Sequence, residues 1–96
     1  MLTTKEVVDR LQANKPLLFE KYPIRSLAIF GSYARNEQIS ASDVDVMVEF
    51  HDKIGLRFID LAEELEVMVG EKIDLVSKNG IKDKYLQAIQ SDLIYV

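Results

Sequence analysis

The stretch FGSYARNEQISASDVDVMVEF, residues 30–50, decides the fold that this sequence predicts. It opens with Gly31 and Ser32 after one apolar run and closes with Asp43 and Asp45 inside another. Aspartate is a poor strand former, and a charge beside a core is costly unless something pairs with it. Side chains two residues apart on a strand point to the same face, so the two carboxylates stand side by side while the intervening valines enter the core.

The rest of the chain alternates between strand and helix patterns around this stretch. The expected strands are Ile24–Phe30, Asp43–Phe50, Glu71–Ser77 and a short closing strand within residues 92–96. The expected helices cover about Thr4–Ala13, Pro16–Tyr22, residues 55–70 and residues 81–90. This order predicts an α/β (α+β) fold, a small mixed sheet with helices mainly on one face, in a single domain over residues 1–96.

Local signals place the helix ends. Thr3 and Glu6 have the spacing of a capping box. Pro16 is expected to end or kink the first helix, or to begin a second one, and Gly70 to cap the helix of residues 55–70. The inward stripe of that helix is expected to comprise Leu56, Ile59, Ala62, Leu65 and Val69.

The composition excludes several classes of protein. The 96 residues contain no cysteine, which removes disulfides, thiolate zinc sites and a cysteine nucleophile. The net charge of −4 makes stable binding to a nucleic acid backbone unexpected, because such binding depends on lysine and arginine. Neither a signal peptide nor an apolar run of membrane-spanning length is present, so we expect a cytoplasmic protein without a membrane partner.

The carboxylates have the chemistry of a metal site. Two neighbouring carboxylates repel unless a cation bridges them, and Mg²⁺ is held by one or two carboxylates plus substrate phosphates. In the strand of residues 71–77, the side chain of Asp74 projects to the face opposite its apolar neighbours in the sequence. It would join Asp43 and Asp45 if this strand lies beside the strand of residues 43–50. A glycine at a strand-to-helix turn lets a phosphate approach the backbone, and the next serine adds a hydroxyl donor. Arg35 is a further candidate for phosphate binding, with a local ion pair as the alternative.

These residues together resemble the signature of the minimal nucleotidyltransferases, within the DNA polymerase β-like nucleotidyltransferase superfamily. The matching positions are Phe30, Gly31, Ser32, Ala34, Arg35, Asp43, Asp45 and, in the later strand, Asp74. The resemblance covers essentially the whole chain and implies the nucleotidyltransferase fold. One departure is Asn36, where the family usually has glycine. Asparagine tolerates a left-handed backbone well, so we expect the turn to survive.

The resemblance also implies roles for the residues. Asp43 and Asp45 would bind Mg²⁺, and Asp74 would act as base or as a further metal ligand. Gly31 and Ser32 would hold the nucleoside triphosphate. Members of this family are often encoded beside a HEPN-domain toxin, as its antitoxin, and resemble enzymes that transfer AMP from ATP to a tyrosine of that toxin.

Three functions follow from these expectations. The first is a magnesium-dependent nucleotidyltransferase that modifies a partner protein. The second is a binding module that neutralises its partner by forming a complex, a hetero-oligomer, with the site vestigial or used only to bind nucleotide. The third, an antibiotic nucleotidyltransferase, is less favoured because so small a domain offers no obvious drug pocket. Tyr33 either stacks on a base or packs in the core, and His51 is expected to be exposed.

Overall fold

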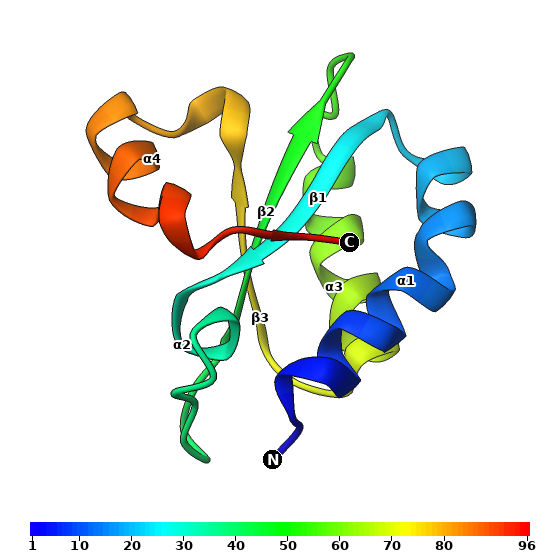
Figure 1. Ribbon diagram of the computed structural model, residues 1–96. Coiled ribbons are helices and arrows are strands. Elements are labelled where there is room, and N and C mark those ends of the chain that lie inside the picture. The colour runs from blue at the N-terminus through cyan, green and yellow to red at the C-terminus, as the bar shows by residue number, and fades with distance from the viewer.

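A four-stranded mixed sheet forms the centre of the molecule in the computed structural model, which describes residues 1–96 (Figure 1). Its strands are β1 (Ile24–Phe30), β2 (Val44–Phe50), β3 (Ile73–Ser77) and β4 (Ile94–Tyr95). They stand in the order β3-β2-β1-β4. β1 runs antiparallel to β2 and to β4, whereas β2 and β3 are parallel. All four predicted strands are confirmed, with small shifts in their bounds.

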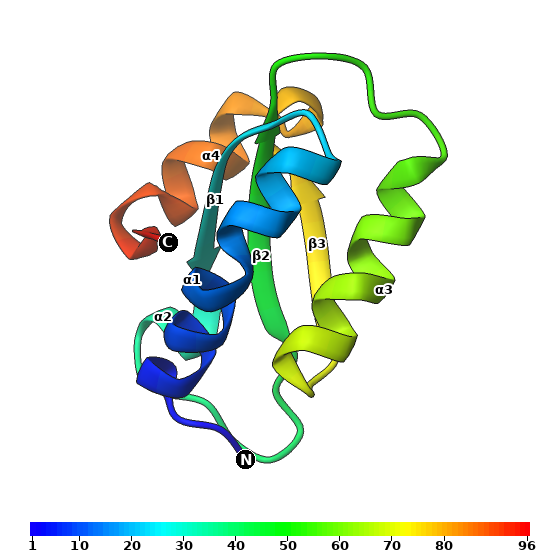
Figure 2. The same ribbon diagram turned by 90° about the vertical axis from the view of Figure 1, so that its right-hand side faces the viewer.

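The helices cover the two faces of the sheet unequally. α1 (Thr4–Lys21) and α3 (Arg57–Val69) pack side by side on one face, and the short α4 (Asp83–Ile89) lies on the other (Figure 2). The remaining turns are α2 (Gly31–Ala34), η1 (Lys78–Gly80) and η2 (Gln90–Asp92). This arrangement confirms the predicted mixed sheet with helices mainly on one face. No helix is long and apolar enough to cross a membrane.

Alternate residues of the strands divide between two hydrophobic clusters. Val44, Val46 and Val48 belong to the cluster of 16 buried residues beneath α1 and α3. Phe30 and Met47 point to the opposite face and form a cluster of three with a residue of α4. Burying one such side chain contributes roughly 1.5–3 kcal/mol relative to exposure. The face beneath α1 and α3 therefore supplies most of the hydrophobic stabilisation.

The first helix is longer than the sequence predicts. The capping box of Thr3 and Glu6 is present, but the expected break at Pro16 is wrong, since α1 continues to Lys21. Pro16 removes one backbone donor, yet Leu11 and Leu18 on either side of it are fully buried. Their packing holds both halves of α1 on one axis, and this contact between distant parts of the chain overrides the local signal.

The inward stripe of α3 differs from the predicted one. Leu56 and Ile59 are exposed by 85% and 58%, so their predicted burial is wrong. The helix begins at Arg57, and its buried residues are Leu61, Leu65 and Val69, spaced by four. Gly70 caps it in a left-handed conformation, as predicted. The stripe is thus rotated toward Leu61, and the expected Leu65 and Val69 remain part of it.

One end of the sheet gathers the predicted functional residues. Because β1 is antiparallel to β2, the end of β1 meets the start of β2, and the start of the parallel β3 lies on the other side of β2 at the same end (Figure 2). α2 follows directly from β1 at this end. Segments that are far apart in the sequence thereby form a single edge of the sheet.

Candidate active site

Asp45 and Asp74 lie side by side at this end of the sheet. They are direct partners in the parallel register of β2 and β3. Asp45 alternates with Val44 and Val46, which are fully buried on the α1 and α3 face, so both carboxylates stand on the opposite face. Asp43 precedes the first residue of β2 by one position and is exposed. β2 and β3 are therefore neighbours, which is the condition under which the sequence predicted that Asp74 joins Asp43 and Asp45.

The three carboxylates interact electrostatically. Partial burial, and then the nearby charges of Asp74 and Asp43, raise the pKa of Asp45 to about 6, and Arg35 opposes this only weakly. A raised pKa means that a negative charge on Asp45 is disfavoured in the protein alone. A divalent cation bound between the carboxylates would remove that repulsion.

The carboxylates do not form a ready-made metal cage. No group of three or more acidic or histidine side chains is arranged to hold a metal ion. Mg²⁺ needs less, since one or two carboxylates suffice when substrate phosphates and water complete the shell. These carboxylates and their mutual repulsion therefore fit an Mg²⁺ ion that binds together with a nucleotide.

Gly31 makes room for the Asp45 carboxylate. Its φ is +73°, and a Cβ at this position would lie 2.1 Å from Oδ2 of Asp45. Only glycine avoids that collision and also adopts this backbone conformation without strain. Phe30, the residue before it, is the register partner of Asp45. The glycine is thus required by the neighbouring carboxylate, a reason that the sequence does not reveal.

Ser32 is placed for ligand binding more clearly than Arg35. The Ser32 side chain is half-buried in α2, and its hydroxyl makes no hydrogen bond within the protein, whereas its carbonyl accepts from the Glu37 amide at 2.8 Å. Arg35 donates to Glu37 at 2.8 Å and to Asp92 at 2.7 Å. Its guanidinium is therefore engaged in two ion pairs. The pair with Glu37 is the local alternative that the sequence left open, and the pair with Asp92 joins distant parts of the chain.

The turn after α2 has the expected backbone conformation, although Asn36 stands where the family usually has glycine. Asn36 has a φ of 57°, the left-handed conformation expected for it. The Thr4 hydroxyl donates to the Tyr33 carbonyl at 2.5 Å and lies 3.3 Å from Oδ1 of Asn36. Tyr33 itself is only 1% exposed, so it packs in the core and does not stack on a base. Thr4 is a supporting residue that sequence reasoning missed, because no local pattern connects it to a turn about thirty positions away.

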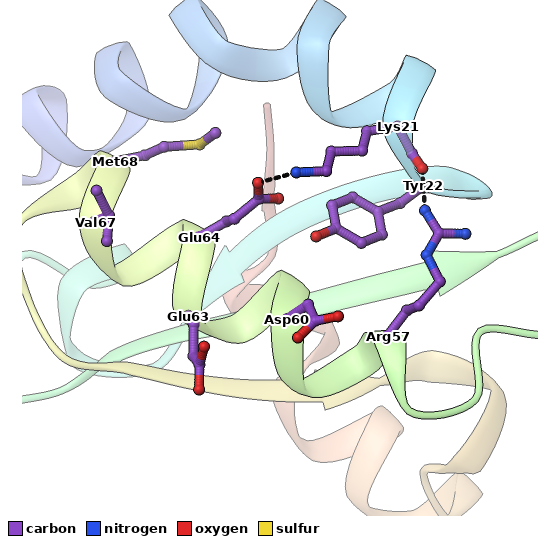
Figure 3. Close-up of a pocket in the computed structure, with 8 residues that line it drawn as sticks. All are labelled: Lys21, Tyr22, Arg57, Asp60, Glu63, Glu64, Val67 and Met68. Carbon is purple, nitrogen blue, oxygen red and sulfur yellow. Dashed lines mark hydrogen bonds and ion pairs between the residues drawn. The ribbon is translucent and has the colours of Figure 1, made fainter.

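Another hollow, lined mainly by charged residues, lies away from the carboxylates. It measures about 490 Å³ between the end of α1 and α3 (Figure 3). Lys21 forms an ion pair with Glu64, and the guanidinium of Arg57 donates to the Lys21 carbonyl and covers the Tyr22 ring at 4.8 Å. These contacts join α1 to α3. No cavity encloses the carboxylates of the candidate active site, which form an open surface.

Comparison with known proteins identifies the family of this site. The family model described as polymerase beta nucleotidyltransferase matches residues 13–95. The chain belongs to this family. The protein is therefore assigned as a nucleotidyltransferase.

Individual relatives in this nucleotidyltransferase family carry more specific names. A candidate protein adenylyltransferase of Methanocaldococcus jannaschii is 48% identical over 98 aligned positions that cover both chains completely. The protein adenylyltransferase MntA of Thermococcus cleftensis is 38% identical, with 100% of this chain and 98% of that protein covered.

Solved structures show the same fold. The structure of a candidate minimal nucleotidyltransferase superposes with a TM-score of 0.82 at 26% identity, covering 99% of this chain and 97% of the other. The MNT antitoxin complex with a tri-AMPylated HEPN toxin of Shewanella oneidensis contains a chain that superposes with a TM-score of 0.69 at 20% identity. That match covers 93% of this chain and 70% of the other.

Proposed function

We propose that this nucleotidyltransferase transfers AMP from ATP to a tyrosine hydroxyl of a HEPN-domain partner protein, with Mg²⁺, and acts as the antitoxin of that partner. The observation that carries the proposal is the direct pairing of Asp45 with Asp74 beside Gly31. The names of the relatives support the choice of a protein acceptor, and the named HEPN complex supports the choice of partner.

Each residue of the site receives one role in this proposal. Asp43 and Asp45 hold Mg²⁺, which neutralises the triphosphate and the charge that develops during the reaction. Gly31 and Ser32 bind the phosphates through the backbone and the free hydroxyl. Asp74 is the general base.

The proposed transfer accounts for the proton, the new bond and the leaving group. Asp74 accepts the proton of the tyrosine hydroxyl, and the oxygen attacks the α-phosphorus of ATP. The bond between the α-phosphorus and the bridging oxygen breaks, and pyrophosphate leaves with that electron pair. The carboxylates beside the attacking oxygen thus serve both to place the nucleotide and to remove the proton.

The test is the intact mass of a HEPN-domain protein, purified from the same source, after incubation with this protein, ATP and Mg²⁺. We expect a mass increase of one or more AMP groups, and none with the variant Asp43→Asn/Asp45→Asn. Asp52→Asn is the matched control, because this exposed aspartate follows β2 away from the site. Transfer that continues in the double variant contradicts the assigned roles.

A second candidate function is neutralisation of the partner by binding alone. The open surface around the carboxylates favours it, because no cavity encloses these carboxylates. Under that function the double variant still neutralises the toxin fully in a growth assay. Loss of neutralisation while the complex persists excludes it. The same lack of an enclosed pocket at the carboxylates disfavours an antibiotic as acceptor.

A further inference from the structure

The outer edge of β3 is an open strand edge that leads to the candidate active site. β3 pairs only with β2, so its other side has no strand partner. The Val44 amide donates to the Lys72 carbonyl, and peptide groups alternate in direction along a strand. The backbone groups of Leu75 and the amide of Ser77 therefore point away from β2, toward solvent.

One position of this edge is already occupied. The Ile73 amide points the same way, and it donates to the Glu66 carboxylate at 3.1 Å. No side chain accepts a hydrogen bond from the amide of Leu75 or of Ser77. Natural proteins usually cover such edges, and an uncovered edge binds an extended segment through main-chain hydrogen bonds. The open part of β3 thus begins immediately after Asp74.

An apolar hollow of about 540 Å³ lies along this open part, and we name it the β3 groove. Its walls include Phe58 of α3, Leu75 and Val76 of β3, and Ile81 and Tyr85 on the α4 side. Leu75 packs with the cluster under α1 and α3, whereas Val76 packs with the cluster under α4. Because residues of both sheet faces line one hollow, the β3 groove extends around the strand edge.

The charge of the groove also constrains its occupant. Lys82 is the one charged residue that lines it, and its side chain is exposed. Lys84 follows two positions later on α4 and is exposed as well. These ammonium groups complement a carboxylate on a bound segment, although the protein as a whole is acidic.

We propose that the β3 groove binds an extended, apolar segment of the nucleotide acceptor as an added strand, with an acidic side chain beside Lys82. This inference rests on the proposed function and names the surface that presents the acceptor. A strand rises about 3.3 Å per residue, so a hydroxyl roughly two to four residues from the apolar anchor reaches Asp74. The Tyr85 ring also meets the Phe30 ring edge-on at 6.5 Å, which connects the groove to the turn at Gly31.

The first experiment adds bulk at the wall of the groove. A Cβ at Gly80, in that wall, meets no atom within 4 Å, so Gly80→Phe introduces an aromatic ring there without a collision at its Cβ. Val67→Phe is the matched control, because Val67 is 84% exposed on α3 and lies outside the groove. We expect Gly80→Phe to raise the KM for a purified HEPN-domain protein about tenfold while the Kd for Mg·ATP stays unchanged. An unchanged KM overturns the proposal.

The second experiment does not depend on catalysis. Amide hydrogen exchange is followed with the HEPN-domain protein present and ATP absent. We expect slower exchange at Leu75 and Ser77, and this protection supports the β3 groove even if no AMP is transferred, an outcome in which only the proposed function fails. Unchanged exchange at both amides overturns the inference. Protection that grows with the concentration of this protein alone assigns the edge to a second copy and also overturns it.

Discussion

At the scale of single residues, close packing against the Asp45 carboxylate sets the requirements of the site. Gly31 has to lack a side chain because of Asp45, and Asp45 has to tolerate the charge of Asp74. Both arrangements weaken the folded protein in the absence of a ligand. Such a conflict between stability and local geometry is typical of a functional site.

Replacing Gly31 by alanine is expected to damage both stability and nucleotide binding. The Cβ would lie 2.1 Å from the Asp45 carboxylate oxygen, at a φ of +73°. We expect a loss of about 1–3 kcal/mol in the free energy of unfolding, measured by urea denaturation. Gly80→Ala is the control, since a Cβ there meets nothing. Equal stability of the two variants would contradict the close packing at Gly31.

Replacing Asp45 by asparagine is expected to stabilise the metal-free protein in a pH-dependent way. The pKa of Asp45 is raised from 3.8 to about 6, so the folded protein binds its proton more tightly than the unfolded chain does. The wild type therefore loses stability as the pH rises between these two values, and the variant does not. With allowance for solvent screening, we expect the variant to gain about 1 kcal/mol above pH 6 and nothing below pH 4.

Thermal unfolding without divalent ions measures this difference. A gain of about 1 kcal/mol corresponds to roughly 4–8 °C in Tm for a domain of this size. The control Asp52→Asn makes the same charge change in the exposed turn after β2. A gain in Asp45→Asn that is the same at pH 4 and pH 7.5 would show that the cause is not the titration of this carboxylate.

At the scale of elements, the strands were predictable and the helices less so. The alternation of apolar and polar residues that predicts β2 is a local feature of the sequence. The register between β2 and β3 then places Asp74 beside Asp45. The continuity of α1 through Pro16 depends on buried contacts with distant residues, which no local signal contains.

Pro16 provides a direct test of this interpretation of α1. Pro16→Ala restores a backbone donor inside a continuous helix, so we expect the free energy of unfolding to rise by about 1–2 kcal/mol. Ala13→Gly, three positions earlier, is expected to lower it by about 1 kcal/mol. Both values come from urea denaturation. A loss of stability in Pro16→Ala would mean that the helix in fact ends there.

At the scale of the whole molecule, the sheet brings together groups that the sequence separates by more than forty positions. Gly31 and Ser32 follow β1 at the start of α2, Asp45 lies in β2, and Asp74 lies in β3, all at one end of the sheet. The sequence predicted these residues as one group because their spacing matches a family pattern. It could not predict that Arg35 pairs with Asp92, because that contact depends on how the C-terminal segment returns to the sheet.

These groups are expected to transfer a nucleotide and not a phosphate. ATP labelled at the α-phosphate or at the γ-phosphate distinguishes the two reactions when each is incubated with Mg²⁺, this protein and a HEPN-domain protein. We expect only the α-label to enter the partner, and we expect Asp74→Asn to abolish this labelling while Mg·ATP still binds. Transfer of the γ-label, or labelling that is unaffected by Asp74→Asn, would contradict this expectation.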